Sequence, residues 1–190
     1  SVQQLKQQGM QSLIFDLRNN SGGYLDIAFE MADQFLPVGK LIVYTEGLKS
    51  PKQDFVATQG GMFENGKLIV LIDEGSASAS EIVAGAVQDW DRGIIMGRRS
   101  FGKGLVQRPF LLPDSSMVRL TTSKYYTPSG RCIQKPYEGG EEAYRSEIFE
   151  RMKHGEMLHA DSIKFPDSLK YYTQNKRVVY GGGGVMPDYF

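Results

Sequence analysis

Short apolar runs alternate with segments of helical periodicity over the first two-thirds of the chain. The apolar runs predict strands at 13–17, 41–45, 68–72 and 93–97. Between them, apolar residues recur every three or four positions, which predicts helices at 24–35 and 81–90. We expect the strand at 13–17 to be buried. Alternating strands and helices are typical of a layered α/β domain.

The pattern changes after the last of these strands. Runs at 105–112 and 117–126 predict a β-hairpin that turns at Pro113, Asp114 and Ser115. Residues 49–65 are polar and contain glycine turn signals, so we expect an irregular excursion there.

Composition shifts again after Gly130. Residues 137–175 are polar and charged, with a helix expected at 141–153, and we interpret 136–176 as an insertion or arm over the core. A short strand from Val178 then leads into a glycine-rich turn. All 190 residues are therefore expected to form one core with an arm.

The first residues have helical spacing, with Val2, Leu5 and Met10 among Lys and Gln, but no capping residue precedes them. We therefore expect the chain to be cut from a longer polypeptide. No stretch reaches the roughly 18–20 apolar residues of a membrane span, and the start lacks the apolar core of a signal peptide.

Charge and composition narrow the possible partners. Apolar residues make up 41% of the chain, and 22 basic residues balance 22 acidic ones without a long run of like charge. A nucleic acid or an acidic lipid surface is therefore not expected as a partner, and no strong membrane binding is expected.

Cysteine and histidine are too scarce for several common sites. One cysteine, Cys132, excludes an internal disulfide framework and a Cys-rich zinc site, and we expect it to be a buried small residue. His154 and His159 lie in a charged segment, where we expect them to be solvated. The sequence thus gives little support to a Ser-His-Asp triad, and it predicts neither a metal nor a cofactor.

Three serines, Ser76, Ser78 and Ser80, lie where the predicted strand at 68–72 gives way to a helix. The N–H groups and positive dipole end of a helix start favour the oxyanion that forms when a serine attacks a carbonyl. A capping box is the simpler local interpretation, because Ser78 and Glu81 have its spacing. Both interpretations remain open at this point.

Lys103, between Gly102 and Gly104, is the candidate base for such a serine. A lysine removes a proton near pH 7 only if burial makes its amine partly neutral, and apolar residues flank this one. Gln107 offers a hydrogen bond that orients the amine without adding charge. An exposed turn lysine and a solvent-facing glutamine are the alternatives.

Acyl transfer also needs two oxyanion donors. The N–H of Ala79, after Ser78, is one candidate. The loop with Gly22 and Gly23 is the natural source of the second, because glycine presents backbone N–H groups without a side chain in the way. A plain turn explains the same glycines.

A phosphate site is an alternative interpretation, because Gly97 to Lys103 has P-loop spacing. Gly104 stands where a P-loop has Ser or Thr, and the following segment has a strand pattern instead of a helix. Nucleotide binding is therefore the least favoured of the interpretations.

Four blocks resemble the C-terminal processing peptidases, or tail-specific proteases, which are serine peptidases with a Ser-Lys dyad. They are residues 17–23, residues 76–86, residues 97–107 around Phe101-Gly102-Lys103-Gly104, and residues 125–130. A weaker fifth block lies near the Met186-Pro187-Asp188 end.

The resemblance implies a role for each matched residue. Ser78 would be the nucleophile, Lys103 the general base and Gln107 the group that orients it, with oxyanion donors from Ala79 and from Gly22 or Gly23. It also implies a crotonase- and Clp-protease-like core, in which stacked ββα units form two sheets with helices outside. Substrates would be proteins or peptides with apolar C-terminal tails, in the bacterial cell envelope and most simply the periplasm.

One departure from the family is plain, because no PDZ pattern is present here. We therefore expect a catalytic core that is weak or silent alone and holds Lys103 out of place. Asp89 lies near family acids but is interpreted as structural. The competing hypothesis is a non-catalytic peptide- or ligand-binding module on the same fold.

Overall fold

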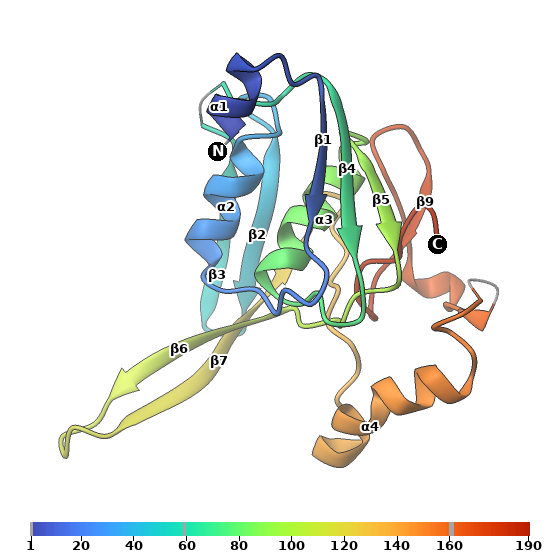
Figure 1. The fold of residues 1–190 in the computed structure, drawn as a ribbon. Helices are drawn as coiled ribbons and strands as arrows, with labels where there is room; N and C mark the ends of the chain where they lie inside the picture. Colours follow the sequence, from blue (N-terminus) through green and yellow to red (C-terminus); the bar gives the residue numbers. More distant parts are fainter. Residues whose placement is uncertain (1, 59, 160–161) are drawn as a thin grey trace.

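The computed structural model describes residues 2–58, 60–159 and 162–190. A parallel three-stranded sheet lies at its centre (Figure 1), in the order β1-β4-β5. Its strands are β1 (Ser12–Asp16), β4 (Lys67–Ile72) and β5 (Ile94–Gly97). Helix α2 (Leu25–Asp33) and helix α3 (Ala79–Asp89) follow β1 and β4 in the chain. The predicted alternation of strands and helices is confirmed, and the mixed α/β class with it.

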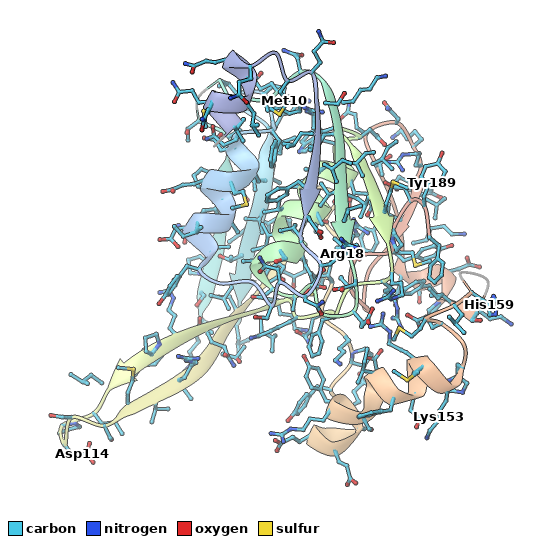
Figure 2. All side chains as sticks on the ribbon, in the orientation of Figure 1. Met10, Arg18, Asp114, Lys153, His159 and Tyr189 are labelled. Carbon is cyan, nitrogen blue, oxygen red and sulfur yellow. The ribbon has the colours of Figure 1, made fainter. Side chains whose placement is uncertain are left out.

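A second sheet is antiparallel, with the order β3-β2-β7-β6. It contains β2 (Leu41–Gly47), β3 (Ser50–Val56), β6 (Leu105–Leu111) and β7 (Met117–Tyr126). The predicted hairpin is confirmed, and it extends well away from the body of the molecule (Figure 1). Asp114 lies at its tip (Figure 2).

Helix α3 is the centre of the core. Every residue from Ser80 to Asp89 is buried, and the helix contacts α2, β2 and β5. The resemblance implied outer helices, whereas α3 is enclosed. Its apolar residues lie in the hydrophobic core, and hydrogen bonds or ion pairs satisfy its buried polar residues Ser80, Glu81, Gln88 and Asp89. Burying each Val or Ile side chain of this kind contributes about 1.5–3 kcal/mol, so α3 fixes the position of its own N-terminus firmly.

Two sequence predictions about strands are wrong. Residues 50–56 form the edge strand β3 within the expected polar excursion, because pairing with β2 stabilises a segment whose side chains are mostly exposed. Strand β1 is an edge strand that leaves Ile14 64% exposed, so the expected full burial of 13–17 is also wrong.

The remaining elements lie at the two ends of the chain. Helix α1 (Val2–Gln7) and helix α4 (Gly140–Lys153) confirm the predicted helical patterns, and α4 lies apart from both main sheets (Figure 1). The short helix η2 (Asp167–Leu169) leads into β8 (Lys170–Tyr172), which pairs with the predicted strand β9 (Val178–Tyr180). Strand β8 was not predicted within the polar segment. None of the helices in the described ranges combines the length and apolarity of a bilayer span.

Candidate active site

The structure distinguishes among the three clustered serines. The Ser76 hydroxyl is fully buried and donates to the Leu17 carbonyl at 2.7 Å. The Ser80 hydroxyl is buried and donates to the Asn20 carbonyl at 2.9 Å. Ser78 is only half-buried and lines a surface hollow. Of the three, Ser78 is therefore the serine that a substrate can reach.

The backbone at Ser78 has a sparsely populated conformation, with φ 55° and ψ −115°. A non-glycine residue pays for a positive φ, and such strain concentrates at functional sites. Ser78 is also the N-cap of α3, and its N–H donates to Glu81 Oε2 as in a capping box. The cap and the exposed serine are thus two features of one residue, at the kind of sharp strand-to-helix turn that exposes nucleophiles in other hydrolases.

Asp73 holds the loop before Ser78 against the glycine loop. Its Oδ1 accepts the N–H groups of Asn19 at 2.8 Å and Gly75 at 3.0 Å. The Ala77 N–H donates to the Asn20 carbonyl at 3.0 Å. These contacts between distant segments bring the predicted oxyanion loop beside Ser78.

Glu81 connects Ser78 to the loop that carries Lys103. One carboxylate oxygen, Oε2, accepts the N–H groups of Ser78 at 2.8 Å and Lys103 at 2.9 Å. The other oxygen, Oε1, accepts the Gly102 N–H at 2.7 Å and the Ser100 hydroxyl. Burial raises the pKa of Glu81, while its four donors act in the opposite direction.

Tyr125, on β7, forms a second connection between the same two residues. Its hydroxyl lies within hydrogen-bonding distance of the carbonyls of Ser78, at 2.9 Å, and Lys103. Burial raises the pKa of Tyr125 well above its usual range, so the phenol keeps the proton that it shares between the two carbonyls. Ser78 and Lys103 are therefore joined through both their N–H and their C=O groups.

The Lys103 side chain is half-buried. Among the described residues, its amine forms no hydrogen bond with the Ser78 hydroxyl or with Gln107, and it forms no salt bridge. Gln107 is exposed on β6 and lines the same hollow as Ser78, which measures about 130 Å³. The structure thus brings Ser78 and Gln107 to one hollow and places Lys103 on the adjoining loop without a formed dyad.

The candidate oxyanion donors differ in whether their backbone N–H groups already donate to another residue. Within the described ranges, the N–H groups of Ala79 and Gly23 donate to no acceptor. The Gly22 N–H donates to Asn20 Oδ1 at 2.9 Å. Gly22 has another constraint, because a Cβ there would lie 2.6 Å from the Ala79 nitrogen. Gly23 is accordingly the better second donor, and Gly22 keeps the space in front of Ala79 clear.

A larger apolar hollow of about 270 Å³ adjoins the first. The two share Gly23, Tyr24 and Ala79. Further lining comes from β1, α2 and α3: Phe15, Asp16, Ile27, Ala28, Met31 and Val83. At its rim, Arg18 holds the pKa of Asp16 at about 2 through a hydrogen-bonded ion pair at 2.6 Å.

Sequence analysis missed the bridging roles of Glu81 and Tyr125. Glu81 was assigned only to the capping box, and Tyr125 only to a block of family resemblance. Their acceptors and donors lie up to 47 residues away in the chain, so no local pattern reports the contact. The signal that could have pointed to Glu81 is a charged residue in the first turn of a helix that continues with six apolar residues or glycine.

The comparison with known families agrees with the geometry. The sequence model of Peptidase family S41 matches residues 1–140. The chain belongs to peptidase family S41.

Curated relatives in this family carry a consistent description. A carboxy-terminal-processing protease of Bartonella bacilliformis is 49% identical over 126 residues, which are 66% of this chain and 29% of that protein. A carboxyl-terminal-processing protease of Synechocystis is 42% identical over 135 residues, which are 71% of this chain and 31% of that protein. The matched region therefore spans about a third or less of these relatives.

A solved S41 structure supports the fold. A photosystem II D1 C-terminal processing protease superposes with a TM-score of 0.64 and 37% identity, covering 69% of this chain and 34% of that one. A lipoprotein from Streptococcus agalactiae, at 14% identity and a TM-score of 0.58, covers 99% of this chain and 52% of the other. That second likeness concerns the fold alone.

Other titratable side chains of the S41 chain lie outside the proposed active site, either exposed to solvent or buried. His154 and His159 are exposed, as predicted. Asp89 is buried, pairs with Arg131 at 2.8 Å and accepts the Ser129 N–H at 2.9 Å. Cys132 is free and half-buried, and burial raises the pKa of its thiol. No cluster of three or more metal-ligating side chains is present in the described parts of the chain.

Proposed function

We propose that this chain is the catalytic core of a serine endopeptidase that cuts proteins near their C-terminal tails. Ser78 is the nucleophile, Lys103 the general base and Gln107 the residue that orients the lysine amine. The observation that carries the proposal is the setting of Ser78: a reachable serine at a strained helix start, with two free N–H groups beside it in an S41 chain.

The reaction follows from these positions. Lys103 Nζ accepts the proton of the Ser78 hydroxyl as Oγ attacks the scissile carbonyl, and the N–H groups of Ala79 and Gly23 stabilise the oxyanion. The amide C–N bond then breaks, and Lys103 returns the proton to the leaving amine. Water, deprotonated by Lys103, hydrolyses the acyl ester and restores the Ser78 hydroxyl.

Proton transfer requires a contact that the present arrangement lacks. General-base catalysis needs the Lys103 amine within about 2.6–3.2 Å of the Ser78 hydroxyl, and such bonds often tighten only in the substrate complex. The backbone of Lys103 is already fixed by Glu81 and Tyr125. Rotation of the flexible lysine side chain, with ordering by Gln107, would complete the dyad.

The apolar hollow suggests the kind of substrate. It adjoins Ala79, so the side chain of the residue that donates the scissile carbonyl can enter it. Phe15, Met31 and Val83 favour an apolar side chain there. This supports an apolar residue immediately before the scissile bond, while the apolar C-terminal tail is proposed from the family resemblance.

We extend the proposal to the architecture and the compartment. The parallel and antiparallel sheets are compatible with a crotonase- and Clp-protease-like core, with 136–176 as an arm and a PDZ domain elsewhere in the complete protein. We place the protein in the bacterial cell envelope, most simply the periplasm. Two relatives are named as chloroplastic, from Arabidopsis thaliana and Tetradesmus obliquus, so cell fractionation is the appropriate test.

Two substitutions in the complete protein test the chemistry. Ser78→Ala and Lys103→Ala should each abolish cleavage of a protein with an apolar tail, while both variants stay folded by circular dichroism. Full activity in either variant would refute the assignment. Tail binding without cleavage by the wild type would support the competing hypothesis of a binding module.

A further inference from the structure

The loop that carries Lys103 also contacts a helix outside the family match. The S41 match ends at residue 140, where α4 begins, and α4 lies apart from both main sheets (Figure 1). Its last turn nevertheless reaches the loop between β5 and β6. Arg151, in that turn, donates to two backbone carbonyls of the loop.

Arg151 is a buried cation, and each of its three nitrogen atoms donates to an acceptor. Its side chain is 4% exposed, and burial lowers its pKa. The guanidinium donates to the carbonyls of Arg99 at 2.6 Å and Ser100 at 3.1 Å. It also donates to Glu156 Oε1 at 2.8 Å. An arginine with this geometry adds two hydrogen bonds to carbonyls of a loop whose N–H groups are already held by Glu81, Ser76 and Val185.

Glu156 joins the helix to the loop a second time. This carboxylate is 7% exposed and pairs with both Arg151 and Arg99, the latter through Nε at 2.5 Å and Nη2 at 2.7 Å. Glu147, on α4, also reaches Arg99 at 3.4 Å. Because removing one partner of a buried ion pair leaves an uncompensated charge, these contacts oppose any separation of α4 from the loop.

The contacts of Arg151 and Glu156 with residues 99–100, which we call the clamp, are linked by hydrogen bonds to the proposed active site. Ser100, whose carbonyl accepts from Arg151, donates its hydroxyl to Glu81. The same Glu81 carboxylate holds the N–H groups of Ser78 and Lys103. Buried hydrogen bonds therefore connect Arg151 to both members of the proposed dyad.

We propose that Arg151 is a positioning residue for the peptidase reaction: it fixes the 99–100 backbone and thereby sets where Lys103 stands relative to Ser78. This inference rests on the proposed function. Arg151 itself touches no substrate. Since a misplacement of about 1 Å can cost a factor of about 100 in rate, loss of the clamp should act on catalysis more than on substrate binding.

The test compares Arg151→Ala with Arg145→Ala in the complete protein. Arg145 lies on the same helix, pairs with Glu141 and is 77% exposed, so it is a matched control. Arg151→Ala should lower kcat about 30- to 100-fold and change KM less than about threefold. Arg145→Ala should match the wild type. Added guanidine at a non-denaturing concentration should restore part of the kcat of Arg151→Ala alone.

A second variant covers the case in which Arg151→Ala does not fold. Arg151→Lys keeps a charge against Glu156 but cannot contact both carbonyls, so it should have an intermediate kcat. Amide hydrogen exchange should also be faster at residues 99–103 in this variant than in the control. Unchanged kcat in a folded Arg151 variant, or equal losses in Arg145→Ala, would overturn the inference. A wild type that cuts nothing would instead overturn the proposed function itself.

Discussion

The backbone N–H groups of Ser78 and Lys103 donate to the same oxygen atom, Oε2 of Glu81, at 2.8 and 2.9 Å. Tyr125 joins the carbonyls of the same two residues. The proposed nucleophile lies at the start of α3 and the proposed base on the loop between β5 and β6, so their spacing depends on these two buried side chains. Catalytic groups need support of this kind because small displacements are costly in rate.

Glu81→Gln should weaken both the fold and the reaction. In the wild type, both carboxylate oxygens of Glu81 accept hydrogen bonds. The amide of glutamine has an NH₂ group in place of one oxygen, so buried N–H groups lose their acceptor at a cost of about 1–3 kcal/mol each. We expect a lower free energy of unfolding and a lower kcat. Glu150→Gln, on an exposed pair with Lys153, is the control and should change stability by less than about 0.5 kcal/mol.

The same variant should alter the pH dependence of stability. Burial raises the pKa of Glu81 in the folded state, so the unfolded chain releases this proton at a lower pH. The stability that Glu81 contributes through this raised pKa is therefore fully present below the pKa of the unfolded chain. It is lost as pH rises through the pKa of the folded protein. Denaturant titrations of the wild type should show this loss, and Glu81→Gln should lack it. An identical slope in both proteins would count against a raised pKa.

Tyr125→Phe removes the hydroxyl that joins the carbonyls of Ser78 and Lys103. The loss should cost about 1–3 kcal/mol and reduce kcat, because the Lys103 carbonyl loses its donor among the described residues, whereas the Ser78 carbonyl keeps the N–H groups of Glu81 and Ile82. Tyr126→Phe is the control, since Tyr126 stacks on Tyr44 at 4.8 Å and its hydroxyl has no partner within the described ranges. Equal stability and activity in the two variants would show that the bridge is dispensable.

Gly22→Ala should block the oxyanion site. The new Cβ would lie 2.6 Å from the Ala79 nitrogen, and Gly22 has a φ of 89° that alanine rarely adopts. We expect kcat to fall about 100-fold, the cost of losing one oxyanion donor. Gly23→Ala keeps its N–H and has no atom within 4 Å of the new Cβ, so its activity should stay close to that of the wild type. The reverse order of activities would contradict this assignment of donors.

Met31→Trp tests whether the apolar hollow receives the substrate side chain. Met31 lies on the open side of α2 and lines the hollow, so the indole should fill part of it. Preference for leucine over alanine before the scissile bond should fall about 10- to 200-fold in kcat/KM. Glu30→Trp, exposed on the same helix, should keep the wild-type preference. A preference unaffected by Met31→Trp would place the subsite elsewhere.

Local periodicity was sufficient for most strands and helices of the first two-thirds of the chain, because the spacing of apolar residues distinguishes a strand from a helix. It failed for β3, whose polar side chains lie on an edge and whose stability comes from pairing with β2. It also failed to separate Gly22 from Gly23, because only the hydrogen bond to Asn20 distinguishes their N–H groups. Contacts between distant segments decide such questions.

The site of covalent labelling tests the central claim most directly. A fluorophosphonate should be incubated with the complete protein, and the modified residue located by peptide mass spectrometry. We predict a single adduct on Ser78, absent in Ser78→Ala and strongly slowed in Lys103→Ala. An adduct on Ser76 or Ser80, or labelling of Ser78 at an unchanged rate without Lys103, would contradict the account.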